Sequence, residues 1–170
     1  MNTKLTYSIF GTVAIAAGLY LLLSKKTNTT MPNTNTNLPR GYRNNNPLNI
    51  RYSAANNWQG KILPNTDGTF EQFSTMAYGY RAALRLIQNK IREGKDTVAE
   101  LISVWAPANE NNTAGYINRV CATTGYVPGT ILSESDREQL VKLVYAMAIV
   151  ENGNTPLPSY DDIYAGWNLL

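Results

Sequence analysis

Residues 133–153, SESDREQLVKLVYAMAIVENG, carry the clearest helical pattern of the chain. Ser135-x-x-Glu138 has the form of a capping box at the start, and Gly153 is the expected stop. The apolar residues recur at intervals of three and four, which places them on one helical face: Leu140, Leu143, Val144 and Met147. We therefore expect an amphipathic helix that begins near Ser133, ends at Gly153 and turns this face toward the core.

Glu151 continues the apolar stripe of this helix. It stands eleven positions after Leu140, and at 3.6 residues per turn eleven steps return to within about 20° of the same line. It also lies at the C-terminal end, where the helix dipole disfavours an anion. Burial and the dipole would both raise the pKa of the carboxyl group, as a general acid requires. The alternative is that the stripe reaches the surface here and Glu151 is solvated.

The composition excludes several kinds of site. The chain has 170 residues, no histidine and one cysteine. Without histidine there is no Ser-His-Asp or Cys-His catalysis and no HExxH zinc site, and Cys121 alone cannot form an internal disulfide. We expect no metal and no cofactor, so the twelve Asp and Glu residues are left for acid–base chemistry. The net charge of +3 comes from scattered basic residues, a pattern that does not predict nucleic-acid binding.

The N-terminal part differs from the rest of the chain. Residues 5–23, LTYSIFGTVAIAAGLYLLL, contain no charge and would form about 28 Å of helix, close to the ~30 Å hydrocarbon thickness of a bilayer. A cleaved signal peptide is the alternative, but LLLSKK offers no small-x-small cleavage site. We expect four parts: an N-terminal end (1–4), a transmembrane anchor (5–23), a flexible Asn/Thr-rich tether (24–38) and one folded domain (39–170).

Within the folded domain the pattern is mostly α (α+β). Ser74 is the expected cap of a helix that runs to Gly94, and a third helix is expected over about residues 113–122. Thr97-x-x-Glu100 is a capping box for the short helix VAELISVWA. The stretch KILPNTDGTFEQF predicts a small strand excursion. The aromatic tail SYDDIYAGWNLL is expected to pack back on the domain.

Several polar residues before the first long helix are candidates for sugar binding. The loop RNNNPLNIR, residues 43–51, presents several amides. Amides match hydroxyl and acetamido groups, and the nearby Tyr52 and Trp58 could cover sugar rings. The alternative is that the asparagines only form turns and that Trp58 belongs to the core. Glu71 alternates with Phe70 and is expected to face solvent. Glu110 either favours the start of the next helix or lies in a cleft.

Five segments together resemble the peptidoglycan-cleaving, lysozyme-like domains of phage virion structural proteins: GYRNNNPLNIR, NNWQG, FEQFSTMAYGYRAALRLI, WAPANENNTAGYINRV and AMAIVENG. The resemblance spans about residues 40–153. More distantly, the chain is similar to bacterial glucosaminidases and lytic transglycosylases, in which a helix ending in a catalytic glutamate precedes such a loop. Here that helix comes last, at residues 146–153. The resemblance therefore implies a circularly permuted lysozyme-like domain.

The resemblance also implies roles for individual residues. Glu151 would be the catalytic acid, and Glu110 is the candidate for a second carboxylate. Sugar contacts would come from six side chains: Asn46, Asn49, Tyr52, Trp58, Gln72 and Tyr116. The implied partners are the peptidoglycan glycan strand, a lipid membrane, expected to be the internal membrane of a phage virion, and capsid or vertex proteins. Transglycosylase, muramidase and glucosaminidase chemistry all remain open, as does a non-catalytic virion component linking membrane and capsid.

Overall fold

The structure, a computed structural model, describes residues 35–170. The predicted anchor at 5–23 and nearly all of the predicted tether lie outside the described residues. Among the helices of 35–170, none has the length and apolar character needed to cross a bilayer.

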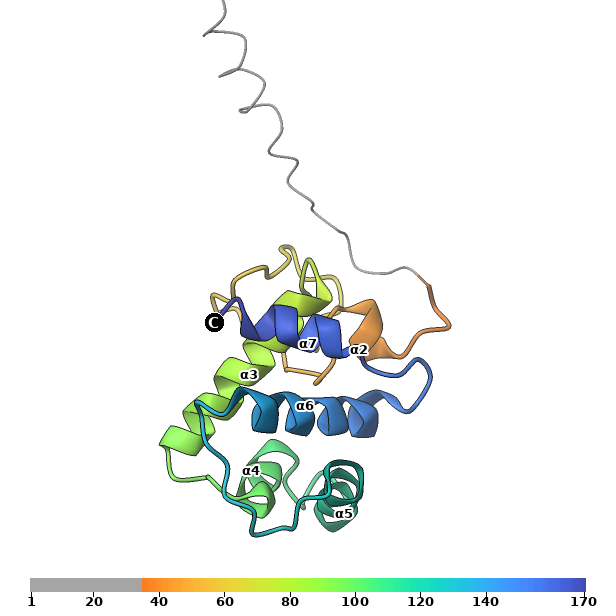
Figure 1. Ribbon diagram of the computed structural model, residues 1–170. Coiled ribbons are helices and arrows are strands. Elements are labelled where there is room, and N and C mark those ends of the chain that lie inside the picture. Colours follow the sequence, from red (N-terminus) through yellow and green to blue (C-terminus); the bar gives the residue numbers. More distant parts are fainter. Residues whose placement is uncertain (1–34) are drawn as a thin grey trace, which may run out of the picture.

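The described residues form six helices, which confirms the mostly α prediction (Figure 1). They are α2 (Arg40–Arg43), α3 (Met76–Arg92), α4 (Val98–Trp105), α5 (Thr113–Thr124), α6 (Arg137–Asn152) and α7 (Tyr160–Trp167). The strands of the predicted excursion do not form, and the segment is irregular. Within 35–170 only isolated bridges occur, of which Arg51 with Phe70 and Lys61 with Phe73 lie in the predicted region.

Side-chain hydrogen bonds cap the starts of α3, α4 and α6. Thr97 accepts a hydrogen bond from the Glu100 N–H, and the Glu100 carboxylate accepts one from the Thr97 N–H, so the predicted capping box is confirmed. The caps of α3 and α6 differ from the prediction by one residue each. Thr75 rather than Ser74 caps α3. Asp136 caps α6 by accepting from the Gln139 N–H, which displaces the predicted box at Ser135.

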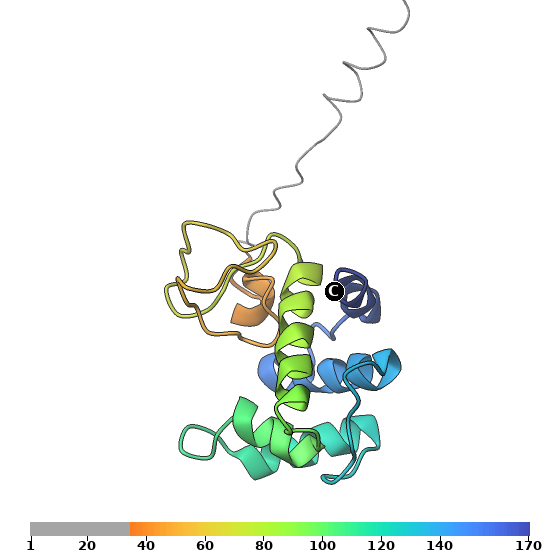
Figure 2. The same ribbon diagram turned by 90° about the vertical axis from the view of Figure 1, so that its left-hand side faces the viewer.

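The helices pack around α3 and α6, which cross in the middle of the domain (Figures 1 and 2). Helices α4 and α5 lie at one end, and α2 lies with the loop 44–75 at the other. Helix α7 packs along α3, so the prediction that the tail folds back on the domain is confirmed. The core joins α3, α4, α6 and α7 through fully buried side chains, which include Tyr80, Leu84, Leu101, Leu140, Leu143, Met147 and Ile163.

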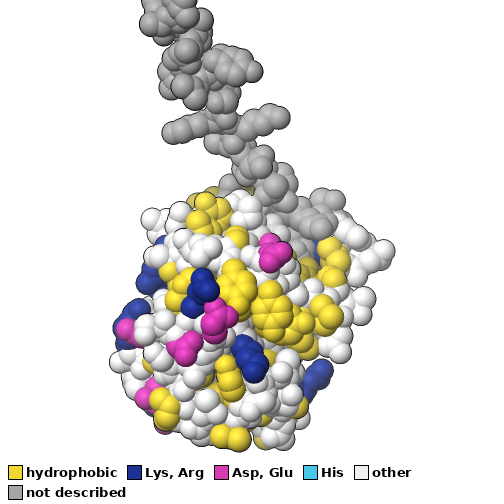
Figure 3. All heavy atoms as spheres, viewed as in Figure 1, with side chains coloured by type: hydrophobic (Ala, Val, Ile, Leu, Met, Phe, Trp, Pro, Cys, Tyr) yellow, Lys and Arg dark blue, Asp and Glu magenta, His cyan; other side chains and the backbone are white. Residues whose placement is uncertain are grey.

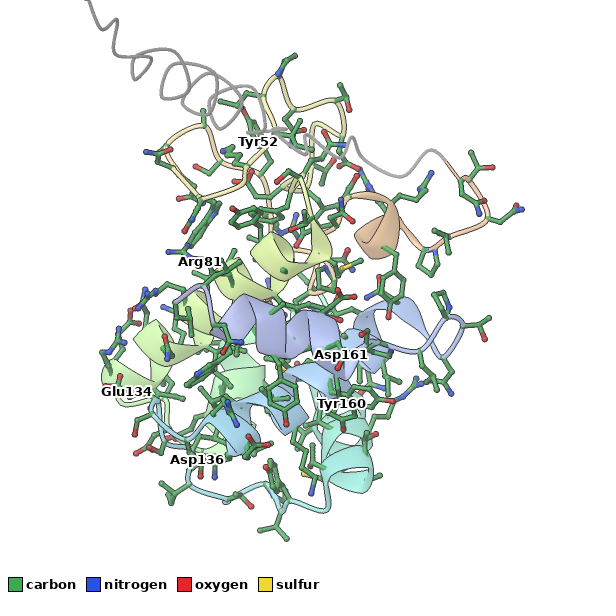
Figure 4. All side chains as sticks on the ribbon, turned by 45° about the horizontal axis from the view of Figure 1, so that its top comes forward. Tyr52, Arg81, Glu134, Asp136, Tyr160 and Asp161 are labelled. Carbon is green, nitrogen blue, oxygen red and sulfur yellow. The ribbon has the colours of Figure 1, made fainter. Side chains whose placement is uncertain are left out.

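The chain end is held by close packing and by two arginines. A Cβ on Gly166 would lie 2.8 Å from the Tyr80 Cβ, so α7 approaches α3 as only glycine allows. Arg81, labelled in Figure 4, donates from Nε to the Leu169 carbonyl at 2.9 Å, and Arg85 donates to the Leu170 carbonyl at 2.7 Å. Hydrophobic side chains also gather on the face of the molecule seen in Figure 3. The ring of Tyr145 in α6 stacks on the ring of Tyr160 in α7, with centroids 4.3 Å apart.

Polar side chains hold the loop 44–75 in place of strand pairing. Asp67 accepts hydrogen bonds from Arg40 at 2.6 and 2.8 Å and from Asn44 at 2.8 Å. Glu71 is fully buried and forms an ion pair with Lys61 at 3.2 Å, so its predicted exposure to solvent is wrong. The alternation with Phe70 does place Glu71 on the opposite side of the backbone, but the folded loop covers that side as well. A buried carboxylate needs such a partner because an isolated charge is costly to desolvate.

Candidate active site

Glu151 lies in the last turn of α6. Its side chain is turned toward the asparagine-rich residues 43–51, here called the asparagine loop, rather than into bulk water. Asn49 Nδ2 donates to one carboxylate oxygen at 3.0 Å, and the Tyr116 hydroxyl donates to the other at 3.0 Å. These partners come from the loop before α3 and from α5. The carboxylate is therefore held by segments 102 and 35 residues earlier in the chain.

Burial raises the pKa of the Glu151 carboxyl group, and hydrogen bonds from Asn49, Tyr116 and Trp105 partly oppose this effect. The net direction is toward the protonated form, which suits a group that gives a proton away. Burial also raises the pKa of Tyr116 well above its ordinary value, and the neighbouring Glu151 charge adds to the increase. The Tyr116 hydroxyl thus stays protonated and remains a donor to the carboxylate.

The end of α6 is fastened to the asparagine loop beside Glu151. Asn152 Nδ2 donates to the Pro47 carbonyl at 2.6 Å and to the Ala148 carbonyl of its own helix at 3.0 Å. Helix α2 closes this junction from a third side at Gly41, where a Cβ would lie 2.2 Å from Asn152 Oδ1 and 3.0 Å from Asn49 Oδ1. The side chain of Asn49, which contacts Glu151, is therefore closely packed against α2 and Asn152.

A cleft of about 500 Å³ opens beside Glu151. One wall is the loop, at residues 48–51 and Phe70, and the other is the segment 104–111, which runs from the end of α4 into the connection to α5. Figure 2 shows these two segments on the same side of α3. Leu86 and Lys90 of α3 complete the lining. Most of the lining residues are apolar or amide, so the cleft places an acid of raised pKa among groups that match a neutral, hydroxyl-bearing ligand.

Glu110 lines the same cleft as Glu151 but in a different environment. Its side chain is 52% exposed and forms an ion pair with Arg51 at 3.0 Å. Arg51 belongs to the loop wall and Glu110 to the opposite wall, so the pair spans the cleft. Glu151 is thus the enclosed carboxyl group of the cleft, and Glu110 is a charge on its rim.

The other predicted sugar contacts divide into two groups. Asn49 and Tyr116 meet at Glu151, whereas Asn46 and Gln72 are buried in the loop. The Asn46 amide donates to the backbone of Ile50 and Glu71 and accepts from the Ile50 N–H. The Gln72 amide donates to the Asn44 side-chain oxygen and accepts from the N–H and the hydroxyl group of Thr66. Both amides are occupied within the protein, so they shape the loop and do not reach a ligand.

The predicted aromatic platforms also lie outside the cleft. Tyr52 lies on the loop side of the domain (Figure 4) with the Lys61 ammonium 4.7 Å from its ring centre, and Trp58 packs partly buried against the core. The aromatic residues that line the cleft are Phe70 and Trp105. The sequence analysis did not single out Trp105, which is also partly buried against the core. Its place as the last residue of α4, just before Pro107, is the signal that could have put it at an edge. Residues 35–170 contain no cluster of acidic or thiol side chains that could hold a metal ion.

Comparison with known proteins identifies one informative relative. Over 131 residues the chain is 37% identical to protein P5 of Pseudoalteromonas phage PM2, an alignment that covers 75% of this chain and 79% of that protein. No family model matches the chain.

Proposed function

The chain belongs to the family of protein P5 of Pseudoalteromonas phage PM2, and from this premise we propose that it is a virion-associated phage enzyme that cleaves the glycan strand of bacterial peptidoglycan. The environment of Glu151 carries this proposal. A single carboxyl group, held by Asn49 and Tyr116 and biased toward protonation by burial, borders a cleft with a largely apolar and amide lining.

The proposed reaction needs one acid that later acts as a base. Protonated Glu151 gives its proton to the glycosidic oxygen as the bond from C1 to that oxygen breaks. A hydroxyl group of the same sugar then attacks C1, and the Glu151 carboxylate removes the hydroxyl proton as the new bond forms. The acid is regenerated, and no water is consumed. Asn49 and Tyr116 stabilise the carboxylate between the two proton transfers, because both donate to it.

The state of Glu110 favours this one-carboxylate route over a two-carboxylate glycosidase. In a glycosidase the second carboxylate acts as nucleophile or base at the sugar. Glu110 is exposed and already engaged by Arg51 on the rim. Lytic transglycosylase chemistry needs only one enclosed carboxyl group, and Glu151 supplies it.

The proposed setting is a phage particle with an internal membrane. Residues 5–23 would anchor the protein there, and 24–38 would give the domain reach toward the cell wall during entry. The lysozyme-like, circularly permuted relationship belongs to the same proposal. It is supported by the contact between the end of α6 and the asparagine loop. A permuted domain needs this contact, because its glutamate helix follows the loop in the sequence but lies beside it in the fold.

The test is digestion of purified peptidoglycan by the full-length chain in mild detergent, with the products identified by mass spectrometry. Anhydro-ended fragments are expected, and reducing ends would instead indicate hydrolysis. Glu151→Gln should abolish product formation. Glu138→Gln, the same change at the opposite end of α6, should not affect it. If the folded wild-type protein releases no fragments, the non-catalytic role, linking membrane and capsid, replaces the enzyme.

A further inference from the structure

The charged residues of the cleft are concentrated at its rim. Arg51 and Glu110 form an ion pair at 3.0 Å, and their side chains are 72% and 52% exposed. Lys90, which lines the cleft from α3, is paired with Glu93 at 2.7 Å. Glu151 is the other ionisable residue of the lining, and its pKa is raised toward the neutral form. The formal charges of the cleft other than Glu151 are thus carried by partly exposed ion pairs.

A glycan strand without its peptides does not need charged groups at the rim. Its sugars present hydroxyl and acetamido groups, which suit the apolar and amide surface near Glu151. The peptides that branch from native peptidoglycan carry free carboxylates and, where they are not cross-linked, a free amine. A guanidinium binds a carboxylate through two parallel hydrogen bonds, and a carboxylate is the natural partner of an ammonium group.

We propose that Arg51 and Glu110 make this cleft selective for glycan strands that carry their peptides, an inference that rests on the proposed function. Arg51 binds a peptide carboxylate, and Glu110 binds a peptide amine. The two residues stand on opposite walls of the cleft, so a peptide leaving the bound sugar passes between them. Each then exchanges its present partner for one on the substrate.

The energetics allow this exchange. Exposed ion pairs contribute little to stability because water screens the charges and both side chains lose freedom. Opening the Arg51–Glu110 pair therefore costs little, and two new charged contacts replace it. A brace between the walls is the competing role for the pair, since it joins the loop to the segment between α4 and α5.

The test compares cleavage rates on two substrates: intact peptidoglycan, and the same material after an amidase has removed the peptides. The full-length wild-type chain should cut the intact material faster. Arg51→Gln and Glu110→Gln should each slow that reaction by roughly three- to fivefold, the upper part of the range for a solvent-exposed charged contact. Both should leave cleavage of stripped strands within about twofold of wild type. As a matched control, Arg137→Gln with Glu138→Gln removes a similarly exposed ion pair at the far end of α6 and should change neither rate.

The exchanged pair Arg51→Glu with Glu110→Arg separates the two roles. It retains opposite charges on the two walls, so a brace predicts wild-type rates. Peptide recognition predicts loss of the preference for intact material, because each charge now faces the wrong group. The proposal is overturned if the exchanged pair behaves as wild type, if the single variants slow both substrates equally, or if wild type cuts both equally. Failure to cut either substrate refutes the proposed function itself, and this inference with it.

Discussion

Replacing Gly41 by alanine should loosen the junction that holds Glu151. Gly41 lies in α2, and an added Cβ would lie 2.2 Å from Asn152 Oδ1, far inside van der Waals contact. The Asn152 side chain cannot simply rotate away, since its amide donates to Pro47 at 2.6 Å and to Ala148 at 3.0 Å. The substitution therefore forces either a shift of α2 or loss of the bond that joins α6 to the asparagine loop.

The expected cost is a net loss of about 0.5–4.5 kcal/mol of unfolding free energy. Overpacking in a fixed environment costs about 1–3 kcal/mol, and a lost hydrogen bond adds about 0.5–1.5 kcal/mol. Alanine returns up to about 1 kcal/mol because it restricts the unfolded chain and favours the helix. The Asn46 carbonyl, 3.0 Å from the added Cβ, prevents full relief by movement of Asn152 alone.

Urea unfolding of four proteins measures this coupling: wild type, Gly41→Ala, Asn152→Ala and the double variant. Because Asn152→Ala removes the atom that clashes, the double variant should be less destabilised than the sum of the single changes by about 1 kcal/mol or more. Gly129→Ala is the control, since a Cβ there meets nothing within 4 Å. Simple additivity, or a Gly41→Ala protein as stable as wild type, would refute the steric reasoning.

Three further predictions concern charge and capping. Glu151→Gln should be more stable than wild type at pH 7, because burial raises the native pKa of Glu151. Wild type loses stability as the pH rises from the unfolded-state pKa of this group to its native pKa. The stability difference between the variant and wild type should therefore shrink on acidification to pH 4. Urea unfolding at the two pH values checks this, and a difference that grows toward pH 4 contradicts the sign. Lys61→Ala should cost about 3–5 kcal/mol, since it leaves the fully buried Glu71 without its cation; adding Glu71→Gln should recover part of the loss in the same measurement. Thr97→Ala should lower the free energy of unfolding by about 1 kcal/mol, because the Glu100 N–H loses the hydroxyl that caps it. The melting temperature should fall accordingly, and an unchanged value would count against that cap.

The helices were the predictable part of this fold, because their signals are local. The Thr97 box depends on residues three apart, and the stripe of α6 depends on intervals of three and four. The one-residue error at the start of α6 has a local cause: Asp136 and Ser135 are both good caps, and only the backbone geometry selects Asp136. The loop 44–75 was misread because side-chain bonds such as Asp67 to Arg40 hold it, and such bonds leave no periodic pattern.

The candidate site shows the same division between local and distant information. Helix geometry favoured an inward-facing Glu151 but left a solvated one open, and the resemblance named Asn49 as a sugar contact; the bond between the two residues came from the fold. Asn46 and Asn49 lie in one asparagine-rich run, but only the fold shows that the first is occupied by backbone and the second by Glu151. The same limit applies to Arg51 and Glu110, since neighbouring residues do not reveal an ion pair across a cleft.

The bond between Asn49 and Glu151 joins residues 102 positions apart. During translation the asparagine loop leaves the ribosome well before α6 has been synthesised, because N-terminal portions of a chain emerge first. The nascent polypeptide can therefore form this carboxyl environment only after α6 has been synthesised. A product released before α6 would carry both walls of the cleft without Glu151.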